Sequence, residues 1–317
     1  MQRPAETAIA PRQATLRLVV QTYLQLLLVG FALLPACFIA YLYYCQGPTA
    51  KFEDHSFHEI AIAVAIVEGL FVAYATWRCY QSSGEPLLRW LTLSFLSFVL
   101  IYAPHGAFTG MAHHNMWLFL LYGPASRFAM ALLLFIGLLS YRQPPERDKA
   151  NVRWWLLWIA AFLLVDVAVA WVATSAFAGH PAVRLSMEGG ALILSVVNVA
   201  FMLSRRILSP LMVIFGISVT WFALSSFAFI IALPWNHMWW LAHVIFAAGF
   251  FLLSYGVAQA FLTTRSFSTI YSQEALMTRL AESMAGTQRA MQEVQQANQK
   301  LEQLAAMKDP PLVPKTA

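Results

Sequence analysis

The amino-acid sequence predicts an all-α fold, a polytopic membrane helical bundle of about eight transmembrane helices followed by a cytoplasmic coiled-coil helix. The first observation is composition, because 60% of the 317 residues are hydrophobic and 11% are charged, whereas a soluble domain has about 25% charged residues. The second is that apolar stretches long enough to cross a hydrocarbon core of about 30 Å recur along the chain. The third is a polar C-terminal segment with heptad spacing.

The apolar stretches that are long enough to form transmembrane helices number eight. In chain order they are residues 16–44, 57–80, 87–108, 115–140, 153–176, 184–204, 208–233 and 236–262. The predicted organisation is an N-terminal segment (1–15), a transmembrane domain (16–262), a coiled coil (263–306) and a disordered tail (307–317). The first segment lacks the apolar core of a removable signal peptide, so we expect the first span to be retained.

Cations near the spans indicate the orientation, because Lys and Arg stay on the cytoplasmic side of a membrane. With the N-terminus inside, the outer loops carry only Lys51 and Arg184. Both termini are therefore expected in the cytoplasm. The net charge of +5 follows from this arrangement, and we infer no nucleic-acid partner. The three cysteines lack CxxC spacing and predict neither a disulfide framework nor a cysteine metal site.

Several spans have features that bear on function. Span one contains Gly30 and Pro35, which predict a tilt or a kink. The second span begins with FHE and the third ends with PHG, so His58 and His105 reach the same outer level of two consecutive antiparallel helices. The short loop to span four has to fold over that level. The eighth span opens with PWNHMWWLAH, whose tryptophans fit an outer aromatic belt.

Histidines at the outer level predict a ligand site with His58 and His105 at its core. Imidazole binds Zn and Cu, and two helix-borne imidazoles can instead hold a haem. Glu59 can orient an imidazole or add an oxygen ligand. The alternative is that histidines at the interface hydrogen-bond water and backbone, which is the expectation for His55, His180 and His237 taken singly. The candidate ligands are His58, Glu59, His105, His113, His114 and His243.

Ionisable residues near the middle of three spans predict a charge network. An unpaired charge at that depth costs at least about 2.5–3.5 kcal/mol, so it normally faces the bundle and finds a partner. The residues are Glu68 in span two, Arg127 in span four and Asp166 in span five. We expect Arg127 to pair with Glu68 or with Asp166. The alternative is a relay for protons or for a ligand.

The chain becomes polar after Leu262, and its apolar residues then recur in steps of three and four, as the a and d positions of a coiled coil do. An amphipathic helix lying on the membrane would need a wider apolar face bordered by cations. Asn298 at a core position favours a parallel two-stranded register. The predicted dimer positions are Leu280, Met284, Met291, Val294, Asn298 and Leu301.

A series of short motifs runs through spans two to four. It consists of Phe57-His58-Glu59, Trp77-Arg78, His105-Gly106, Gly110-Met111, Asn115, Trp117 and Ser126-Arg127. In this order the motifs resemble the membrane-associated sensor (MASE-type) domains of bacteria. The stretch LEQLAAMKDP is similar to the junction that precedes a GGDEF domain. The remaining spans share only the hydrophobic pattern of that family.

The resemblance implies a sensory input module in the bacterial inner membrane that detects an outer ligand and acts, through a homodimeric coiled coil, on a GGDEF diguanylate cyclase or a histidine kinase. The sequence contains no GxxxxGK, HExxH or GxSxG motif. We therefore expect no enzymatic activity in this chain and assign the output to a missing or partner domain. The alternative is a haem- or quinone-linked membrane redox protein or a small-molecule transporter, neither of which needs a dimeric cytoplasmic helix.

Overall fold

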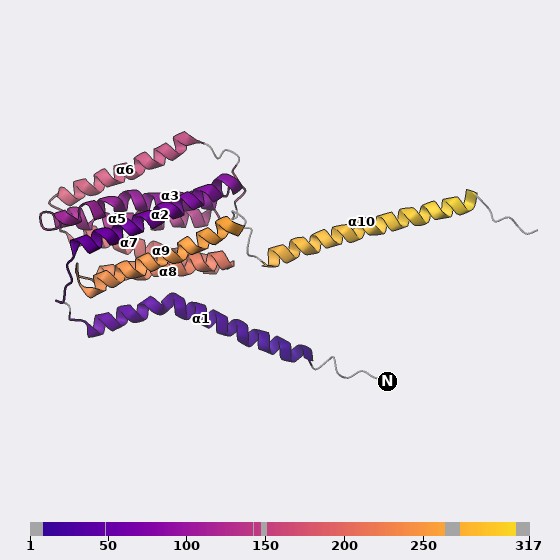
Figure 1. The fold of residues 1–317 in the computed structure, drawn as a ribbon, viewed down its shortest axis with the longest axis horizontal. Helices are drawn as coiled ribbons and strands as arrows, with labels where there is room; N and C mark the ends of the chain where they lie inside the picture. Colours follow the sequence, from indigo (N-terminus) through magenta and orange to yellow (C-terminus); the bar gives the residue numbers. More distant parts are fainter. Residues whose placement is uncertain (1–8, 48, 142, 147–150, 264–272, 309–317) are drawn as a thin grey trace, which may run out of the picture. The chain divides into compact units, whose positions relative to one another are not determined.

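The computed structural model of the chain (Figure 1) describes residues 9–47, 49–141, 143–146, 151–263 and 273–308. Within these ranges the secondary structure is helical, apart from one isolated antiparallel bridge between Lys51 and Asn236. The chain divides into a helical bundle, Met1–Ile270, and a C-terminal unit, Tyr271–Ala317. Each unit is described by itself below.

The described residues of the bundle contain eight helical segments long and apolar enough to cross a membrane, which confirms the predicted number of spans. The protein is therefore an all-helical, multi-pass membrane protein. Its helices are α1 (Ile9–Cys45), α2 (His55–Ser83), α3 (Pro86–Ala107), the 3₁₀ turn η1 (Thr109–Met111), α4 (Met116–Leu120), α5 (Tyr122–Leu139), α6 (Val152–Thr174), α7 (Pro181–Ser204), α8 (Pro210–Ile231) and α9 (His237–Thr263).

Two spans differ from their predicted form. Helix α1 begins at Ile9, inside the range 1–15 that the sequence predicts as a separate segment. The fourth span is split at Leu121 into α4 and α5. Pro124 accounts for the split, because proline has no N–H to donate to the carbonyl of Leu120 and its ring clashes with that carbonyl.

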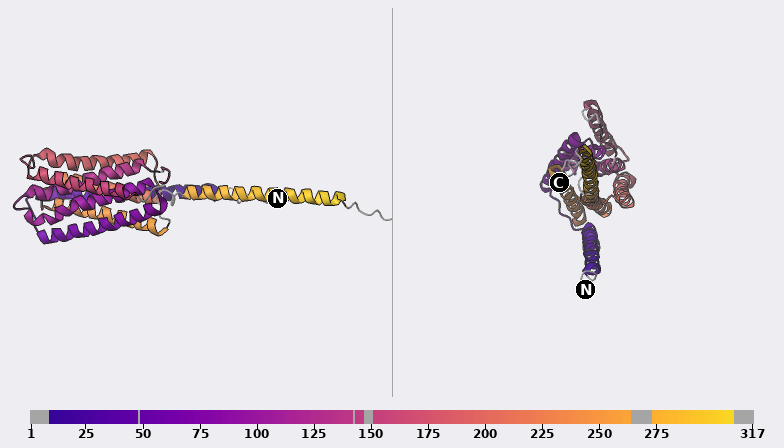
Figure 2. Two further views of the ribbon diagram at one scale, coloured as in Figure 1. Left: turned by 90° about the horizontal axis from the view of Figure 1, so that it is seen from above. Right: turned by 90° about the vertical axis from the view of Figure 1, so that its right-hand side faces the viewer.

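Six of these helices form a closed ring. Each packs against the next in the order α2, α3, α5, α7, α8, α9, and α9 returns to α2. Helix α1 lies outside the ring against α8 and α9, and α6 lies outside it against α3. The view along the bundle in Figure 2 places α1 and α6 at opposite edges. The ring therefore encloses the core, and α1 and α6 leave most of their surface for lipid.

Polar side chains join neighbouring helices of the ring, as expected in a medium without water to satisfy buried polar atoms. Thr92 on α3 donates to Thr76 on α2 over 3.1 Å, and Ser94 on α3 donates to the carbonyl of Met130 on α5 over 3.0 Å. Further links are Asn198 to the Ala131 carbonyl (α7 to α5, 3.3 Å), Ser225 to the Ala242 carbonyl (α8 to α9, 2.8 Å), Ser254 to Glu68 (α9 to α2, 3.3 Å) and Arg184 to the Phe229 carbonyl (α7 to α8).

Glu146 fastens the loop after α5 to the turn between α2 and α3. Its backbone N–H donates to the carbonyl of Gly84 over 2.8 Å, and its carboxylate accepts from Tyr80 over 2.7 Å and pairs with Arg89 over 2.7 Å. The turn itself depends on Gly84, whose φ of 73° is a conformation that side-chain-bearing residues rarely adopt. Local turn chemistry thus fixes the antiparallel pairing of α2 and α3.

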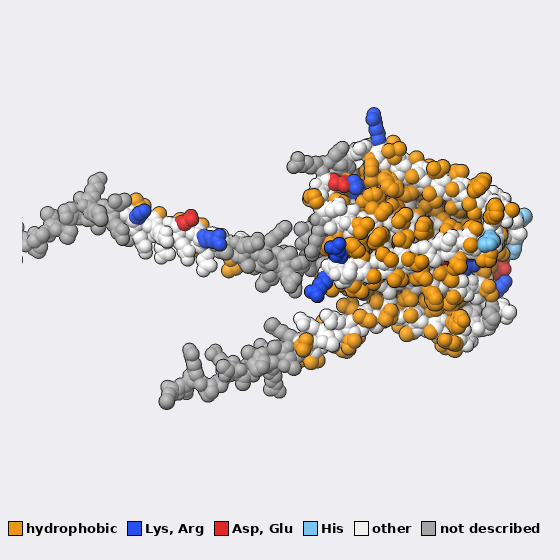
Figure 3. Space-filling model, turned by 180° about the vertical axis from the view of Figure 1, so that it is seen from behind, with side chains coloured by type: hydrophobic (Ala, Val, Ile, Leu, Met, Phe, Trp, Pro, Cys, Tyr) orange, Lys and Arg blue, Asp and Glu red, His pale blue; other side chains and the backbone are white. Residues whose placement is uncertain are grey.

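The two ends of the bundle differ in their charged side chains. On the face of the bundle drawn in Figure 3, most of the visible Lys and Arg side chains lie at the end where α2 finishes and α3 starts, whereas the visible histidines lie at the opposite end. We call the latter, where α2 and α9 begin and α3 ends, the histidine end. This separation agrees with the distribution along the sequence from which the two membrane faces are predicted.

The C-terminal unit contains one long helix, α10 (Gln273–Lys308). Met284, Met291, Val294 and Leu301, four of the predicted dimer positions, are exposed in the single chain. Asn298 is also exposed. The side chain of Leu280 lies outside the described set. Exposed apolar residues at heptad spacing are compatible with packing against a second helix. The predicted coiled coil stays a prediction, because the structure describes a single chain.

Gly106 permits the close approach of α3 to α2 at the histidine end. A Cβ atom at this position would lie 2.7 Å from Cγ2 of Ile62. We expect Gly106→Ala to destabilise the bundle by about 1–3 kcal/mol, the usual cost of overpacking, and to lower the midpoint of thermal unfolding in detergent.

Gly30 provides the matched control, because no atom lies within 4 Å of the position its Cβ would take. In the interior of α1, Gly30→Ala should be neutral or raise stability by up to about 1 kcal/mol through helix propensity. Equal shifts of the midpoint in both variants would contradict the packing argument.

Candidate functional site

Three histidines from three helices meet at the histidine end. His58 lies in the first turn of α2, His105 in the last turn of α3 and His243 near the start of α9. His58 and His105 are buried, and His243 is half-buried. Their ring centroids are 5.0 Å apart for His58 and His105, 5.3 Å for His58 and His243, and 6.4 Å for His105 and His243. We call this cluster the histidine triad.

Each ring of the triad is oriented by a hydrogen bond at Nδ1. His105 Nδ1 donates to the carbonyl of Phe119 over 2.7 Å, and His243 Nδ1 donates to the carbonyl of Trp239 over 2.9 Å. His58 Nδ1 lies 3.0 Å from Oγ1 of Thr109, whose own proton goes to the carbonyl of His105. Since that hydroxyl proton is in use, His58 Nδ1 is the donor. All three imidazoles therefore carry their free lone pair on Nε2.

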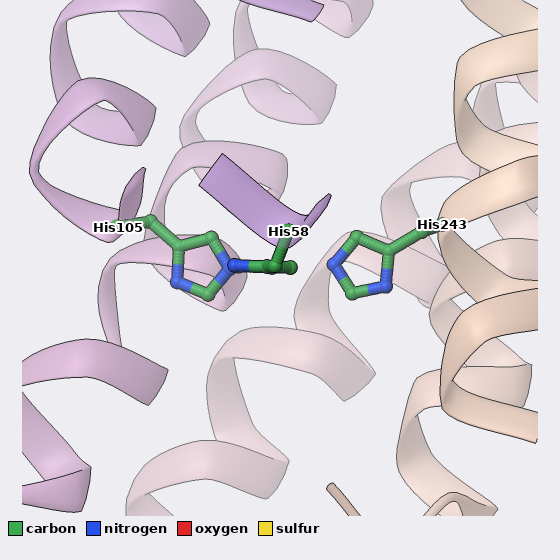
Figure 4. A group of neighbouring side chains, drawn as sticks. All are labelled: His58, His105 and His243. Atoms are coloured by element: carbon green, nitrogen blue, oxygen red, sulfur yellow. The ribbon is translucent and has the colours of Figure 1, made fainter. Parts of the chain in front are cut away.

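The Nε2 atoms of the triad are the ones available to a ligand. Those of His58 and His243 are buried without a hydrogen-bond partner among the described residues. One nitrogen from each of the three rings lies within 4.8 Å of the others. In Figure 4 a nitrogen of His105 and a nitrogen of His243 point toward each other, beside the ring of His58. A buried acceptor without a donor is costly, so this convergence makes the histidine triad a candidate site for a bound group.

Aromatic rings surround the triad. His105 stacks on Phe119 with centroids 4.8 Å apart, and His58 stacks on Trp239 at 5.0 Å. Trp239 also contacts His243 at 4.2 Å. Such packing holds the imidazoles in place. Neutral imidazole with a free Nε2 is the state that binds a metal ion.

The dimensions of the triad fit one metal ion. A tetrahedral ion with metal–nitrogen distances of about 2.1 Å holds its ligand atoms about 3.4 Å apart, so shifts of about one ångström would close the triad around it. Hydrogen bonds at the distal nitrogen are also the usual support of ligating histidines. A haem ligated by His105 and His243 does not fit, because its macrocycle would overlap the ring of His58 and the aromatic rings stacked there.

A second group of possible ligands lies nearer the surface. Glu53 Oε1 is 3.2 Å from Nε2 of His55 and 3.5 Å from Nε2 of His113. The predicted ligand His113 is thus exposed and belongs to this group, apart from the triad. Trp235 contacts both groups, with centroids 5.1 Å from His55 and 5.5 Å from His58.

Two other predicted ligands do not join the triad. Glu59 is exposed, because it follows His58 on α2 and successive residues of a helix point about 100° apart. His114 is exposed as well. The structure therefore brings together His58, His105 and His243 from the predicted set and leaves Glu59, His113 and His114 outside.

Arg127 forms a buried ion pair, but with Glu188 on α7. Its Nε donates to Oε2 of Glu188 over 3.2 Å, and its Nη2 donates to Oε1. Both side chains are at most 4% exposed. The predicted pairing with Glu68 or Asp166 is wrong. Helix α5 packs against α3 and α7, so Glu68 on α2 is on the far side of α3, and Asp166 lies on α6, outside the ring.

Glu68 and Asp166 have other surroundings. Glu68 accepts a hydrogen bond from Ser254 over 3.3 Å and lines a lipid-facing hollow of about 830 Å³ between α2 and α9. The backbone carbonyl of Asp166 accepts from Tyr122 over 3.1 Å, and its carboxylate atom Oδ1 is buried without a partner among the described residues. The three predicted intramembrane charges thus occupy three separate places.

A small cavity connects the triad with the ion pair. It has a volume of about 20 Å³, enough for one water molecule, and its walls include His105, His243, Arg127 and Glu188. The ring of Phe229 also bridges the two sites, since it lies 4.0 Å under the Arg127 guanidinium and 4.8 Å from the ring of His243.

Sequence reasoning missed two kinds of functional residue. Thr109, which orients His58, lies four residues after His105 in a short loop. The sequence feature that could have identified it is a threonine close to a predicted ligand. Glu188, the partner of Arg127, lies near the start of the predicted sixth span. Its signal in the sequence was an ionisable residue within a span, which normally finds a partner.

In comparisons with known proteins, no protein-family model, curated protein or solved structure matches this chain.

Removing one member of the ion pair should strongly destabilise the bundle. Arg127→Met leaves the buried carboxylate of Glu188 unpaired, and the usual cost of that change is about 3–5 kcal/mol. The double variant with Glu188→Leu should recover much of the loss. The measurement is the free energy of unfolding in detergent, arranged as a double-mutant cycle.

Glu68→Leu provides the control cycle, because Glu68 bonds to Ser254 and lies apart from Arg127. Coupling of Arg127 to Glu68, with none to Glu188, would overturn the pairing described above.

Proposed function

We propose that this protein is a membrane-integrated sensory input module that binds a transition-metal ion, Zn²⁺ or Cu²⁺, at its histidine end through His58, His105 and His243. The observation that carries the proposal is the set of three oriented imidazoles, each with its Nδ1 engaged in a hydrogen bond and with one nitrogen of every ring within 4.8 Å of the others. Imidazole nitrogen suits these two ions. The aromatic rings packed against the imidazoles hold these ligands in place.

The positions of the ligands support a role in signalling. His58 and His105 belong to α2 and α3, which are paired through a tight turn, whereas His243 belongs to α9, the last helix of the bundle. A bound ion would draw the start of α9 toward α2 and α3. Loss of the ion would remove this link between α9 and the pair α2–α3. Because α10 follows α9 in the chain, a shift of α9 could be passed on to α10. Metal occupancy would thus select between two packings of one helix.

The orientation in the membrane is part of the proposal. Arg78, Arg89, Arg205 and Arg206 flank the spans at the end opposite the histidines, and such cations favour the cytoplasm. The histidine end would then face the outside and both termini the cytoplasm of a bacterial inner membrane. The likeness of spans two to four to MASE-type sensor domains supports the same arrangement and a GGDEF or histidine-kinase output.

Dimerisation through α10 is the proposed route of transmission. In the single chain Met284, Met291 and Val294 are each at least 61% exposed, although they are apolar residues on an otherwise polar helix. A parallel coiled coil would bury them, and Asn298 would set its register. Helices in such a register can pass a rotation or shift to an attached output module.

One observation favours a different function. The lipid-facing hollow beside Glu68 is large enough for a membrane-soluble molecule such as a quinone, which would suit a redox protein or a small-molecule transporter. An absorption spectrum and a quinone extraction of the purified protein separate this candidate from the sensor. The packing of the triad weighs against a haem between His105 and His243.

Substitution of the triad should abolish metal binding. His58→Ala, His105→Ala and His243→Ala each remove one ligand, so bound Zn²⁺ or Cu²⁺, measured by elemental analysis after dialysis, should fall to background. Thr109→Val removes the acceptor that orients His58 and should weaken affinity by about 10–100-fold, as changes next to metal ligands typically do. A chelator should lower the thermal stability of the parent protein only.

His114→Ala is the matched control, because His114 is exposed and outside the triad. Its metal content should equal that of the parent. If all three triad variants keep their metal, or if the parent binds none, the proposed metal sensor is wrong.

Cysteines at the predicted core positions of α10 should crosslink two copies in membranes. Leu280→Cys and Val294→Cys place thiols at heptad core positions, where paired helices bring equivalent residues into contact. Gel electrophoresis under non-reducing conditions measures the covalent dimer. Gln296→Cys, on the opposite face of the same helix, should crosslink much less, and equal yields at all three positions would argue against a coiled coil.

A further inference from the structure

A larger cavity lies beside the start of α7, separate from the histidine triad. Its volume is about 450 Å³. We call it the α7 cavity, and it is lined by Trp117, Gly179, His180, Pro181, Arg184, Leu185, Glu188 and Ile230. These residues come from α4, the start of α7 and the end of α8, together with the residues that precede α7. Neither the ion pair nor the proposed metal site requires an opening of this size.

The charges of the α7 cavity are unbalanced. Arg184 and Glu188 both line it, but the carboxylate of Glu188 is engaged by Arg127. The hydrogen bonds of Arg184 go to the backbone carbonyls of Phe229 and Ala232, and both are donated by Nη2. Within the described residues, no carboxylate forms an ion pair with Arg184. The one carboxylate among these residues is paired with Arg127, which leaves the positive charge of Arg184 beside the cavity without a carboxylate partner.

A second polar side chain, His180, lines the same cavity. His180 Nδ1 accepts a hydrogen bond from the backbone N–H of Ala182 over 3.3 Å. The proton of its neutral ring is therefore on Nε2, which is able to donate. His180 is the N-cap residue of α7 and Arg184 lies in its first turn, and both side chains line the cavity. A guanidinium beside an imidazole N–H is an arrangement that recognises a carboxylate.

The remaining walls of the cavity are apolar. Trp117, Leu185 and Ile230 contribute an indole and two aliphatic side chains. A doubly charged phosphate would carry more negative charge than the single positive charge of Arg184 can neutralise. It would also have no apolar part to pack against these side chains. A monoanion with an apolar body matches both parts.

We propose that the α7 cavity is a binding site for an organic monocarboxylate. The carboxylate lies at Arg184 and His180, and the apolar body packs against Trp117, Leu185 and Ile230. The site stands without any metal ion. Arg184 and Glu188 are also walls of the small cavity that reaches His105 and His243, so the carboxylate would bind next to the triad and within reach of its electrostatic field.

The test uses the full-length protein, stripped of metal with a chelator, in nanodiscs of phosphatidylcholine, a lipid that supplies no carboxylate. Isothermal titration calorimetry with phenylacetate and with its neutral isostere phenylacetamide measures the contribution of the charge. We expect phenylacetate to bind and phenylacetamide to bind at least about tenfold more weakly, because the charge-assisted hydrogen bonds are lost. A parallel titration with oleate incorporated in the lipid tests a membrane fatty acid as the source of the carboxylate.

Variants assign the binding to Arg184. Arg184→Gln should weaken phenylacetate binding about tenfold or more, whereas Arg205→Gln, at the other end of α7, should leave it unchanged. Because Arg184 also caps α8, Ile230→Trp serves as a second variant, which keeps the charge and fills the cavity, and it too should lose binding.

Equal binding of acid and amide, or full binding by both Arg184→Gln and Ile230→Trp, would overturn the proposal, as would failure of both phenylacetate and oleate to bind. Metal binding by the triad is measured separately, so either proposal can fail without the other.

Discussion

The structure depends on one constraint, the lack of water in the hydrocarbon core to satisfy polar groups. Each membrane-spanning segment satisfies its backbone groups by forming a helix. The polar side chains are satisfied by hydrogen bonds to side chains or backbone carbonyls of neighbouring helices. Each step around the ring has such a link, from the hydroxyl bond between Thr92 and Thr76 to the ion pair of Arg127 with Glu188. These contacts select the neighbours of each helix, which apolar side chains facing lipid cannot do.

Because water is absent from the hydrocarbon core, the buried polar atoms without a hydrogen-bond partner point to places where a ligand could bind. In an interior where nearly every donor and acceptor is satisfied, converging lone pairs on buried imidazoles are an exception that a bound cation would remove. Arg184 is a second exception, because its positive charge has no carboxylate partner among the described residues. A bound anion would neutralise that charge. The two sites lie close together because both use the end of the ring where α7, α8 and α9 are near their termini.

Phe229 and the small cavity suggest how the two sites would influence each other. The ring of Phe229 touches both Arg127 and His243, and its carbonyl accepts from Arg184. Three neutral imidazoles leave a divalent ion with its full charge, so a carboxylate nearby would strengthen ion binding. By reciprocity the ion would strengthen carboxylate binding to the same degree. A module with both sites would respond most strongly when the two ligands are present together.

The sequence by itself determined the class of protein, the eight spans and the level of the main polar residues, because span length and cation distribution follow directly from the thickness and charge of a membrane. It also placed His58 and His105 together, since a tight turn joins their helices. Only the tertiary structure decided that His243 completes the triad instead of His113, and that Arg127 pairs with Glu188. Depth along a helix can be counted from its ends, but the order of helices around the ring is set by side-chain packing between segments far apart in the chain.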